Sequence, residues 1–189
     1  MALSNIHISD FKTQFSGGTR QNRFLIEGTI PYGGGQISKF HVRATQIPAL
    51  STLPIEYNWM GRKGFYPGEK QYQTWSVAVI DDTGTNDTWK KIHNWHNNIN
   101  NHVTNNSAIP TTSSTYKANY WTIKHLNLNG NESTPLKEFK MYGIWPRTIM
   151  DIPLNMANPN TINQFTVIFL YDWITISNVT QQVGGTTPD

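Results

Sequence analysis

Alternation of apolar and polar side chains is the sequence feature that most restricts how this chain can fold. A period of two is typical of strands that turn one face toward a core. Strand-like runs with this character cover residues 23–30, 37–45, 75–80, 119–128 and 136–145. The pattern therefore predicts a mainly β protein built from antiparallel strands.

The longest run, QFTVIFLYDWITIS at residues 164–177, is apolar on both faces. Phe165, Val167, Phe169, Tyr171 and Trp173 share one face of a regular strand. Further apolar side chains lie on the other face: Ile168, Leu170 and Ile174. We expect this strand to be covered on both sides.

Two turn signals separate the runs. The first, Gly33-Gly34-Gly35, provides residues that tolerate positive φ and predicts a hairpin between residues 23–30 and 37–45. The second, Asn129-Gly130, is a favoured two-residue turn and predicts a hairpin between residues 119–128 and 136–145.

One segment has a helical period. Asp87 is a suitable N-cap, and apolar residues then recur at intervals of three and four: Trp89, Ile92, Trp95, Ile99 and Val103. A helix at about residues 87–103 should pack across the sheets or close one end of a barrel. The expected fold is two antiparallel sheets that form a small barrel or sandwich, with one α-helix and an extended β-arm.

Composition limits the function. The chain of 189 residues has no cysteine, and charged residues are 14% of it, against about 25% in an average soluble domain. Disulfides and thiol chemistry are excluded. We see no signal peptide at the N-terminus and no membrane segment. A surface so poor in charge suits a subunit that assembles better than a free monomer.

Motifs that could carry catalysis are weak. His93, His96 and His102 lack a carboxylate to complete a metal site. Asp81-Asp82 lies in a turn without the apolar surroundings that a catalytic acid pair needs. The three glycines are not followed by the Lys-Ser/Thr of a phosphate loop. We therefore predict no catalytic residues, no metal and no cofactor.

The stretch PIEYNWMGRKGFYPGEK, residues 54–70, combines large apolar side chains with prolines, glycines and charges. It is too broken for a core strand and too apolar for a solvated loop. Three interpretations are open from the residues alone. The stretch caps its own barrel, contacts neighbouring subunits, or presents a platform for sugars.

Six short motifs occur in the order that tail tube proteins of contractile, T4-like phages show. Five of them are continuous: RQNRFLI at 20–26, RATQIPA at 43–49, KIHNW at 91–95, GIWP at 143–146 and YDW at 171–173. The sixth is spread over residues 54–77 and consists of Pro54, MGRK at 60–63, Gly68 and WSV at 75–77. Over about residues 20–175 the chain resembles this family, whose fold is shared with type VI secretion ring (Hcp-like) proteins. Its glycine hairpin, its linker at 104–115 and its longer C-terminal tail depart from the pattern.

The resemblance implies a structural subunit of the phage tail tube, which forms hexameric rings that stack into a hollow conduit for DNA. The implied partners are other copies of the chain, the sheath protein, a baseplate or tube initiator and a tail terminator, with double-stranded DNA passing unbound. The implied location is the virion tail, assembled in the host cytoplasm. Two alternatives are a tube subunit or initiator of another contractile injection particle, and a monomeric carbohydrate-binding β-module.

The resemblance also divides the chain into an N-terminal segment (1–19), one tail-tube domain (20–178) and a flexible C-terminal tail (179–189). Its arm, at about 50–70, is expected to contact neighbouring subunits. The expected contact residues are Leu53, Pro54, Tyr57, Trp59, Met60, Arg62, Lys63, Phe65 and Tyr66. Because DNA must slide through the bore, we further expect most of these basic residues to be paired or to face away from the bore: Lys39, Arg43, Lys70, Lys124, Lys137 and Lys140.

Overall fold

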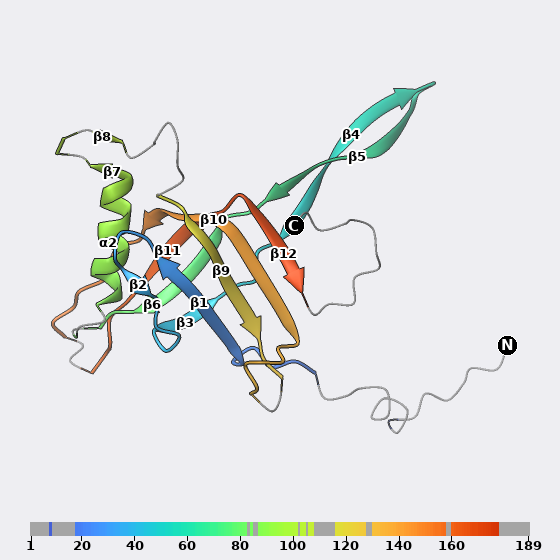
Figure 1. Ribbon diagram of the computed structural model, residues 1–189. Helices are drawn as coiled ribbons and strands as arrows, with labels where there is room; N and C mark the ends of the chain where they lie inside the picture. Colours follow the sequence, from blue (N-terminus) through green and yellow to red (C-terminus); the bar gives the residue numbers. More distant parts are fainter. Residues whose placement is uncertain are drawn as a thin grey trace.

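The long strand β10 (Lys137–Ile149) organises the computed structural model of the chain (Figure 1). One side of its first half pairs with β9 (Ala118–His125). The other side pairs with β12 (Trp173–Ser177) along the first half and with β11 (Gln164–Leu170) along the second. The structure describes residues 8, 18–82, 84, 87–101, 103–104, 106–107, 116–127, 130–157 and 160–177.

The remaining strands extend this sheet on both sides, and every pairing is antiparallel. On one side β9 pairs with β1 (Phe24–Ile30), which pairs with the short β2 (Gly35–Gln36). On the other side β11 pairs with β6 (Trp75–Ile80), and β6 pairs with β3 (Val42–Thr45). Two separate pairs are β4 (Leu50–Trp59) with β5 (Arg62–Tyr72), and β7 (Asn100–Asn101) with β8 (Asn106–Ser107).

The sheet curls, so that two layers face each other across one core. We call β1, β9, β12 and the first half of β10 the first layer, and β3, β6, β11 and the second half of β10 the second layer. Trp121 of the first layer lies 6.0 Å from Trp75 and 5.0 Å from Phe169 of the second, measured between ring centroids. All three rings are fully buried. The predicted fold class, mainly β with one helix and an extended arm, is confirmed.

The helix α2 (Thr88–Ile99) lies across one end of the curled sheet (Figure 1). Its N-cap is Asp87, as predicted, and the Asp87 carboxylate accepts a hydrogen bond from the Lys90 amide at 2.9 Å. Ile92 and Trp95 are fully buried, so the predicted apolar stripe faces the core there. The helix ends earlier than expected because Asn100 is already extended and begins β7, which leaves Val103 exposed.

A bend at Gly143 carries β10 from the first layer into the second. Before it, Phe139 and Met141 face the core, whereas after it Ile144 does, so the inward-facing positions shift by one residue. Gly143 has φ of 64°, in the left-handed region that favours glycine. The GIWP segment is therefore a corner within a strand and not a turn between strands.

The neighbouring strand changes direction at the same level. Tyr171 is buried and Asp172 lies opposite the bend, where its amide donates to the Tyr142 carbonyl at 2.9 Å. The inward-facing pattern shifts here too, which places Trp173 on the outside with 45% of its surface exposed. The prediction that Trp173 shares the buried face of Phe169 is wrong for this reason, and the run forms two strands instead of one.

The predicted strand at 37–45 is confirmed for Val42–Thr45, which form β3, and is wrong for residues 37–41. Ile37 and Val42 are both buried, but they are five positions apart and would point to opposite faces of one strand. A turn resolves this conflict, since the His41 amide donates to the Ser38 carbonyl at 3.1 Å. The chain after this turn joins β6 in the second layer. The contact with β1 is therefore limited to Gly35, Gln36 and the Ile37 amide, which donates to the Gly28 carbonyl at 2.9 Å.

The predicted second hairpin does join β9 and β10, but not through a two-residue turn. The strands end at His125 and resume at Lys137, which leaves a longer connection. Asn129 lies outside the described residues, as do His102, the tail at 179–189 and most of the segment 1–19.

Replacing Gly143 with alanine is expected to destabilise the fold by about 2 kcal/mol, because a side chain here must adopt positive φ. The added Cβ would also overlap the Asp172 carboxylate, which holds the Lys117 ammonium at 2.7 Å. Thermal or denaturant unfolding measures the loss.

Gly84→Ala is the matched control, because a Cβ at Gly84 meets only ordinary contacts, at 3.5 Å or more. Equal stability of the two variants would contradict the role given to the bend.

Candidate assembly surface

The β4–β5 hairpin projects from the body of the protein (Figure 1). Its strands pair with each other from Leu50 opposite Tyr72 to Trp59 opposite Arg62. Met60 and Gly61 form the tip, with φ values of 47° and 76°. Two successive positive φ values are typical of a type I′ turn, whose twist suits a two-residue hairpin.

The register divides the outer hairpin into two faces, since directly paired residues point to the same side. One side carries Ile55, Tyr57, Trp59, Arg62 and Tyr66, and we call it the aromatic face. The rings of Tyr57 and Tyr66 stack with their centroids 4.6 Å apart. Each of the four large apolar or aromatic side chains on this face is between 43% and 70% exposed.

The opposite side, the polar face, carries Glu56, Asn58, Lys63 and Phe65. The Lys63 ammonium pairs with the Glu56 carboxylate at 2.7 Å. Arg62, on the aromatic face, has no ion-pair partner among the described residues. The hairpin therefore satisfies the lysine on its polar face and leaves a cation available on its aromatic face.

The residues predicted to contact neighbours all lie on this hairpin, but on different faces. Tyr57, Trp59, Arg62 and Tyr66 lie on the aromatic face, and Lys63 and Phe65 on the polar face. Met60 is at the tip and 87% exposed. The sequence analysis missed Ile55, because its orientation follows only from the register.

An irregularity lies part-way along the hairpin. The register shifts between Thr52 and Pro54, next to Leu53, and Pro54 then stands opposite Pro67. Neither proline has an amide hydrogen. The register shift therefore makes the ladder irregular at this level, and neither proline can donate to it.

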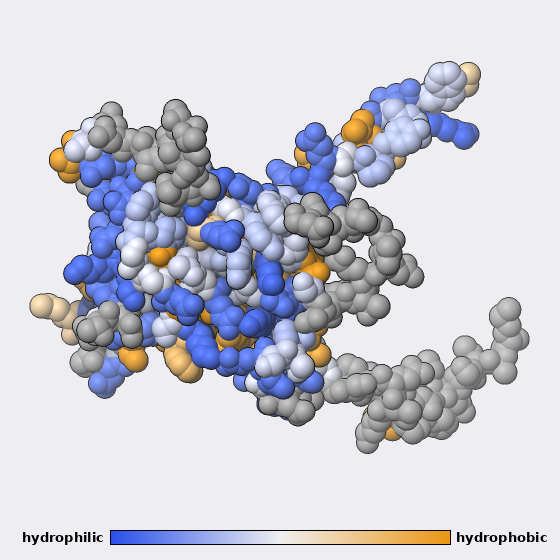
Figure 2. All heavy atoms as spheres, in the orientation of Figure 1, coloured by the Kyte–Doolittle hydropathy of each residue, from blue (hydrophilic) through white to orange (hydrophobic). Residues whose placement is uncertain are grey.

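The hairpin does not fold back onto its own body. Figure 2 shows it standing clear, with apolar residues among polar ones. Eight large apolar or aromatic side chains on it are at least 43% exposed. The interpretation in which it caps its own barrel is therefore wrong. Exposed apolar groups gathered in this way mark interaction sites more often than free surface.

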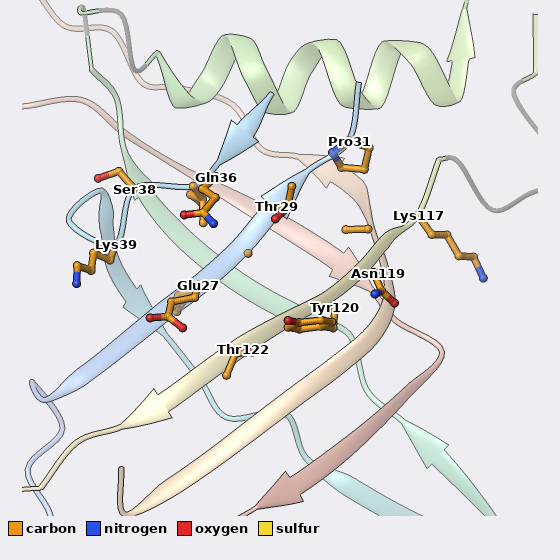
Figure 3. Close-up of a pocket in the computed structure, with 14 residues that line it drawn as sticks. Glu27, Thr29, Pro31, Gln36, Ser38, Lys39, Lys117, Asn119, Tyr120 and Thr122 are labelled. Carbon is orange, nitrogen blue, oxygen red and sulfur yellow. The ribbon is translucent and has the colours of Figure 1, made fainter. Parts of the chain in front are cut away.

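The outer face of the first layer is a second distinctive surface, and it is largely polar. Figure 3 shows Glu27, Tyr120 and Thr122 beside a groove of about 810 Å³ along β1, β2 and β9. The Lys124 ammonium pairs with Glu27 at 2.7 Å, and Lys140 lies 3.6 Å from Glu138. The charges of this face therefore largely neutralise one another.

An aromatic row crosses the same face. Trp173 stacks on Tyr142 with 3.8 Å between ring centroids, and Tyr120 follows at 5.9 Å. The Lys117–Asp172 ion pair lies near the end of this row. The Asp172 carboxylate accepts a hydrogen bond from Lys117, and this raises the pKa of Lys117 above its ordinary value.

The predicted pairing of basic residues is confirmed for Lys124, Lys140 and also Lys39, which pairs with Glu132 at 2.7 Å. Arg43 donates to the Gln164 side-chain oxygen at 3.1 Å. For Lys70 and Lys137 the described residues contain no ion-pair partner.

A polar cluster that the sequence analysis missed fixes the start of the helix. His41 Nε2 lies 3.5 Å from the Asp82 carboxylate, and its Nδ1 lies 2.9 Å from the Thr88 hydroxyl. The arrangement has the types of side chain of a hydrolase triad, but Thr88 is only 2% exposed and cannot meet a substrate. The cluster therefore ties α2 to the chain around β3 and β6.

The described residues contain no group of three or more His, Asp or Glu side chains placed to hold a metal. Of the three histidines considered, His102 lies outside them. Burial raises the pKa of the Tyr171 hydroxyl to about 12. Among helices of the described part, none is long and apolar enough to cross a membrane.

The family model for phage tail tube proteins matches residues 11–176. The chain belongs to the phage tail tube protein family. The tail tube protein gp19 of Enterobacteria phage T4 is 25% identical over 171 residues, which cover 88% of this chain and 98% of that protein. The corresponding protein of phage T6 matches to the same extent.

Solved structures of contractile injection particles share the fold. The tube-terminating cap of the anti-feeding prophage aligns with a TM-score of 0.62 and 19% identity, covering 95% of this chain and 100% of that one. A chain of the sheath–tube complex of the PVC extracellular injection system aligns at 0.60 and 18%, covering 92% and 99%. A chain of the six-fold symmetrised anti-feeding prophage baseplate aligns at 0.61 and 14%, covering 88% and 100%.

The chain is therefore a structural subunit of a tail tube, a component of the virion tail, of the kind found in contractile phages and related injection systems. The resemblance read from the short motifs is confirmed. The hairpin and the outer face of the first layer are the tail tube surfaces whose roles remain to be assigned.

Gly64→Ala is expected to release the Tyr57 ring from its stack on Tyr66, because a Cβ at Gly64 would overlap that ring. The stack contributes about 0.5–1.5 kcal/mol beyond area burial. Ring-current shifts of the two tyrosines in NMR spectra of the free tail tube subunit measure the change. Asn58→Ala, on the polar face, should leave both signals in place; a Gly64→Ala spectrum with the wild-type shifts would contradict the assigned contact.

Proposed function

We propose that this chain forms six-membered rings, that the rings stack into a hollow tube, and that the tube conducts double-stranded DNA without binding it specifically. The hairpin is proposed as the main contact to neighbouring copies, through the nine residues named from the sequence together with Ile55. The observation that carries this proposal is the exposure of the hairpin, on which eight large apolar or aromatic side chains are at least 43% exposed.

Burial of these side chains against another copy would stabilise the assembly. At roughly 25 cal/mol for each Å² of apolar surface, several such side chains contribute several kcal/mol per contact. The hairpin is already paired and turned in the subunit, so little conformational entropy is lost when it docks.

Two open edges of the first layer support ring formation. β12 pairs only with β10, and the start of β1, from Phe24 to Glu27, pairs only with β9 among the described residues. Unpaired strand edges are templates for pairing with another chain. Because the two edges differ, they favour a head-to-tail contact, and such contacts close into rings when the rotation between copies permits. The number six is carried over from the family and from the six-fold symmetry of the fold's baseplate relative.

The outer face of the first layer is proposed to line the bore. DNA slides only where few unpaired cations meet its phosphates. The Lys124–Glu27 and Lys140–Glu138 pairs satisfy this condition on a face otherwise rich in hydroxyl and aromatic groups. Sheath, baseplate or initiator, and terminator proteins are the proposed partners of the outside and the two ends of the tube. Catalysis is not part of the proposed function.

Replacing residues 56–65 with Asn-Gly tests the contact role of the hairpin. The change keeps Ile55 opposite Tyr66 and supplies a favoured turn, so the body should fold with its normal thermal stability. Electron microscopy of the purified protein should show tubes for the wild type and at least a tenfold loss of tubes for the variant. Tubes at normal yield would refute the contact role, and a stable wild-type monomer that binds glycans would refute tube formation itself.

Glu27→Gln tests the bore. The variant leaves the Lys124 ammonium without its carboxylate in every copy, so assembled tubes should retain short duplex DNA at low salt and release it as salt rises. Retention is measured by co-sedimentation with tubes. Glu69→Gln removes the same charge from the hairpin and should behave as the wild type. No retention by Glu27→Gln tubes would contradict the assignment of this face to the bore.

A further inference from the structure

The hairpin and the connection between β10 and β11 lie at opposite ends of the second layer. The hairpin leads directly into Trp75, the first residue of β6. At the other end of β6, the Asp81 amide donates to the Asn163 carbonyl at 3.0 Å, and the Met150 amide donates to the Thr166 carbonyl at 2.8 Å. Figure 1 shows the hairpin projecting from one end of the body and this connection at the far end.

The connection exposes apolar side chains that the fold does not use. Met150, Leu154, Met156 and Ile162 are 43%, 81%, 105% and 68% exposed. We call these four residues, with Asp151 among them, the end patch. Four large apolar groups on one connection, all exposed, make it a candidate for a second interaction surface on the same subunit.

Asp151 gives the end patch its charge. It is exposed, and it has no ion-pair partner among the described residues. Arg43, the cation nearest along that end of β3, is held by the Gln164 side-chain oxygen at 3.1 Å. The end patch therefore combines apolar groups with one available carboxylate, while the aromatic face combines apolar groups with one available guanidinium, that of Arg62.

We propose that the aromatic face of one copy docks on the end patch of a second copy, with Arg62 paired to Asp151. The two surfaces match in chemistry: both carry exposed apolar side chains, and the unpaired charges of Arg62 and Asp151 are opposite in sign. An arginine–carboxylate pair can form two parallel hydrogen bonds, which fixes orientation as well as adding attraction. The polar face of the hairpin, with its internal Glu56–Lys63 pair, points away from the contact.

The position of the two surfaces assigns the contact to stacking. It rests on the proposed function, in which the lateral edges of the first layer close the ring. Sheet edges face sideways, whereas the hairpin and the end patch lie at opposite ends of strands. Head-to-tail contacts close into a ring or continue as a filament, depending on the rotation between copies. Because the sheet edges already close the ring in the proposed function, the contact between opposite ends is assigned to copies in successive rings.

Charge reversal tests the pairing in tube assembly. Arg62→Glu and Asp151→Arg each place like charges in the contact, and each should lower the yield of tubes at least about tenfold while single rings still form. The double variant restores opposite charges and should recover tubes to within a few-fold of the wild type. Asn58→Glu, on the polar face, is the matched control and should keep near-normal yield.

The results separate the docking from the proposed function. If the wild type forms tubes but the double variant gives no higher tube yield than the single variants, the Arg62–Asp151 contact is refuted and the proposed tube is not. Failure of the wild type to form rings or tubes would overturn both. Loss of rings in the single variants would place the contact within the ring and overturn its assignment to stacking.

A covalent test uses the absence of cysteine in the chain. A variant with Arg62→Cys and Asp151→Cys should form disulfide-linked ladders under mild oxidation of assembled tubes, because each copy would link to the next. Each single replacement and the pair Glu56→Cys with Asp151→Cys serve as controls and should give at most dimers. The proposed register would be refuted if the variant with Glu56→Cys and Asp151→Cys gave equal ladders. It would also be refuted if the variant with Arg62→Cys and Asp151→Cys gave none.

Discussion

The bend at Gly143 is the constraint on which the arrangement of this subunit depends. β10 is paired along both halves, and only a shift in its inward-facing positions lets one strand contribute to both layers. The shift turns Trp173 outward and completes the aromatic row on the outer face. The same bend brings Trp75 and Phe169 over Trp121. Core and outer face are thus consequences of one glycine with positive φ.

The subunit keeps the contacts that stabilise its fold and its proposed assembly contacts in separate parts. The core and the helix cap are satisfied within the body, where the tryptophans and Asp87 have their partners. The hairpin has its backbone paired but its apolar side chains exposed. A subunit of this kind folds first and gains further stability from neighbours, which agrees with its membership of a tail tube family.

Alternation was sufficient to predict the class of fold, because most strands keep one buried face from end to end. It could not predict the bend at Gly143, because a shift of one residue there exchanges the inward-facing and outward-facing side chains of the rest of the strand. It also merged residues 37–45 into one strand, although buried Ile37 and Val42 cannot share a face. The family motifs located the hairpin, but its two faces required the register of Ile55 with Tyr66. Asp151 carried no signal, because an isolated aspartate in a loop is usually solvated.

The paired prolines in the hairpin have a mechanical consequence. Where Pro54 faces Pro67 and the register shifts, the ladder lacks the donors that stiffen the rest of the ribbon. We therefore expect the outer part of the hairpin to tilt against its base most easily at this level. In the tube proposed for this protein, such a joint would provide elastic compliance: the filament would curve while the tips of its hairpins kept their proposed contacts.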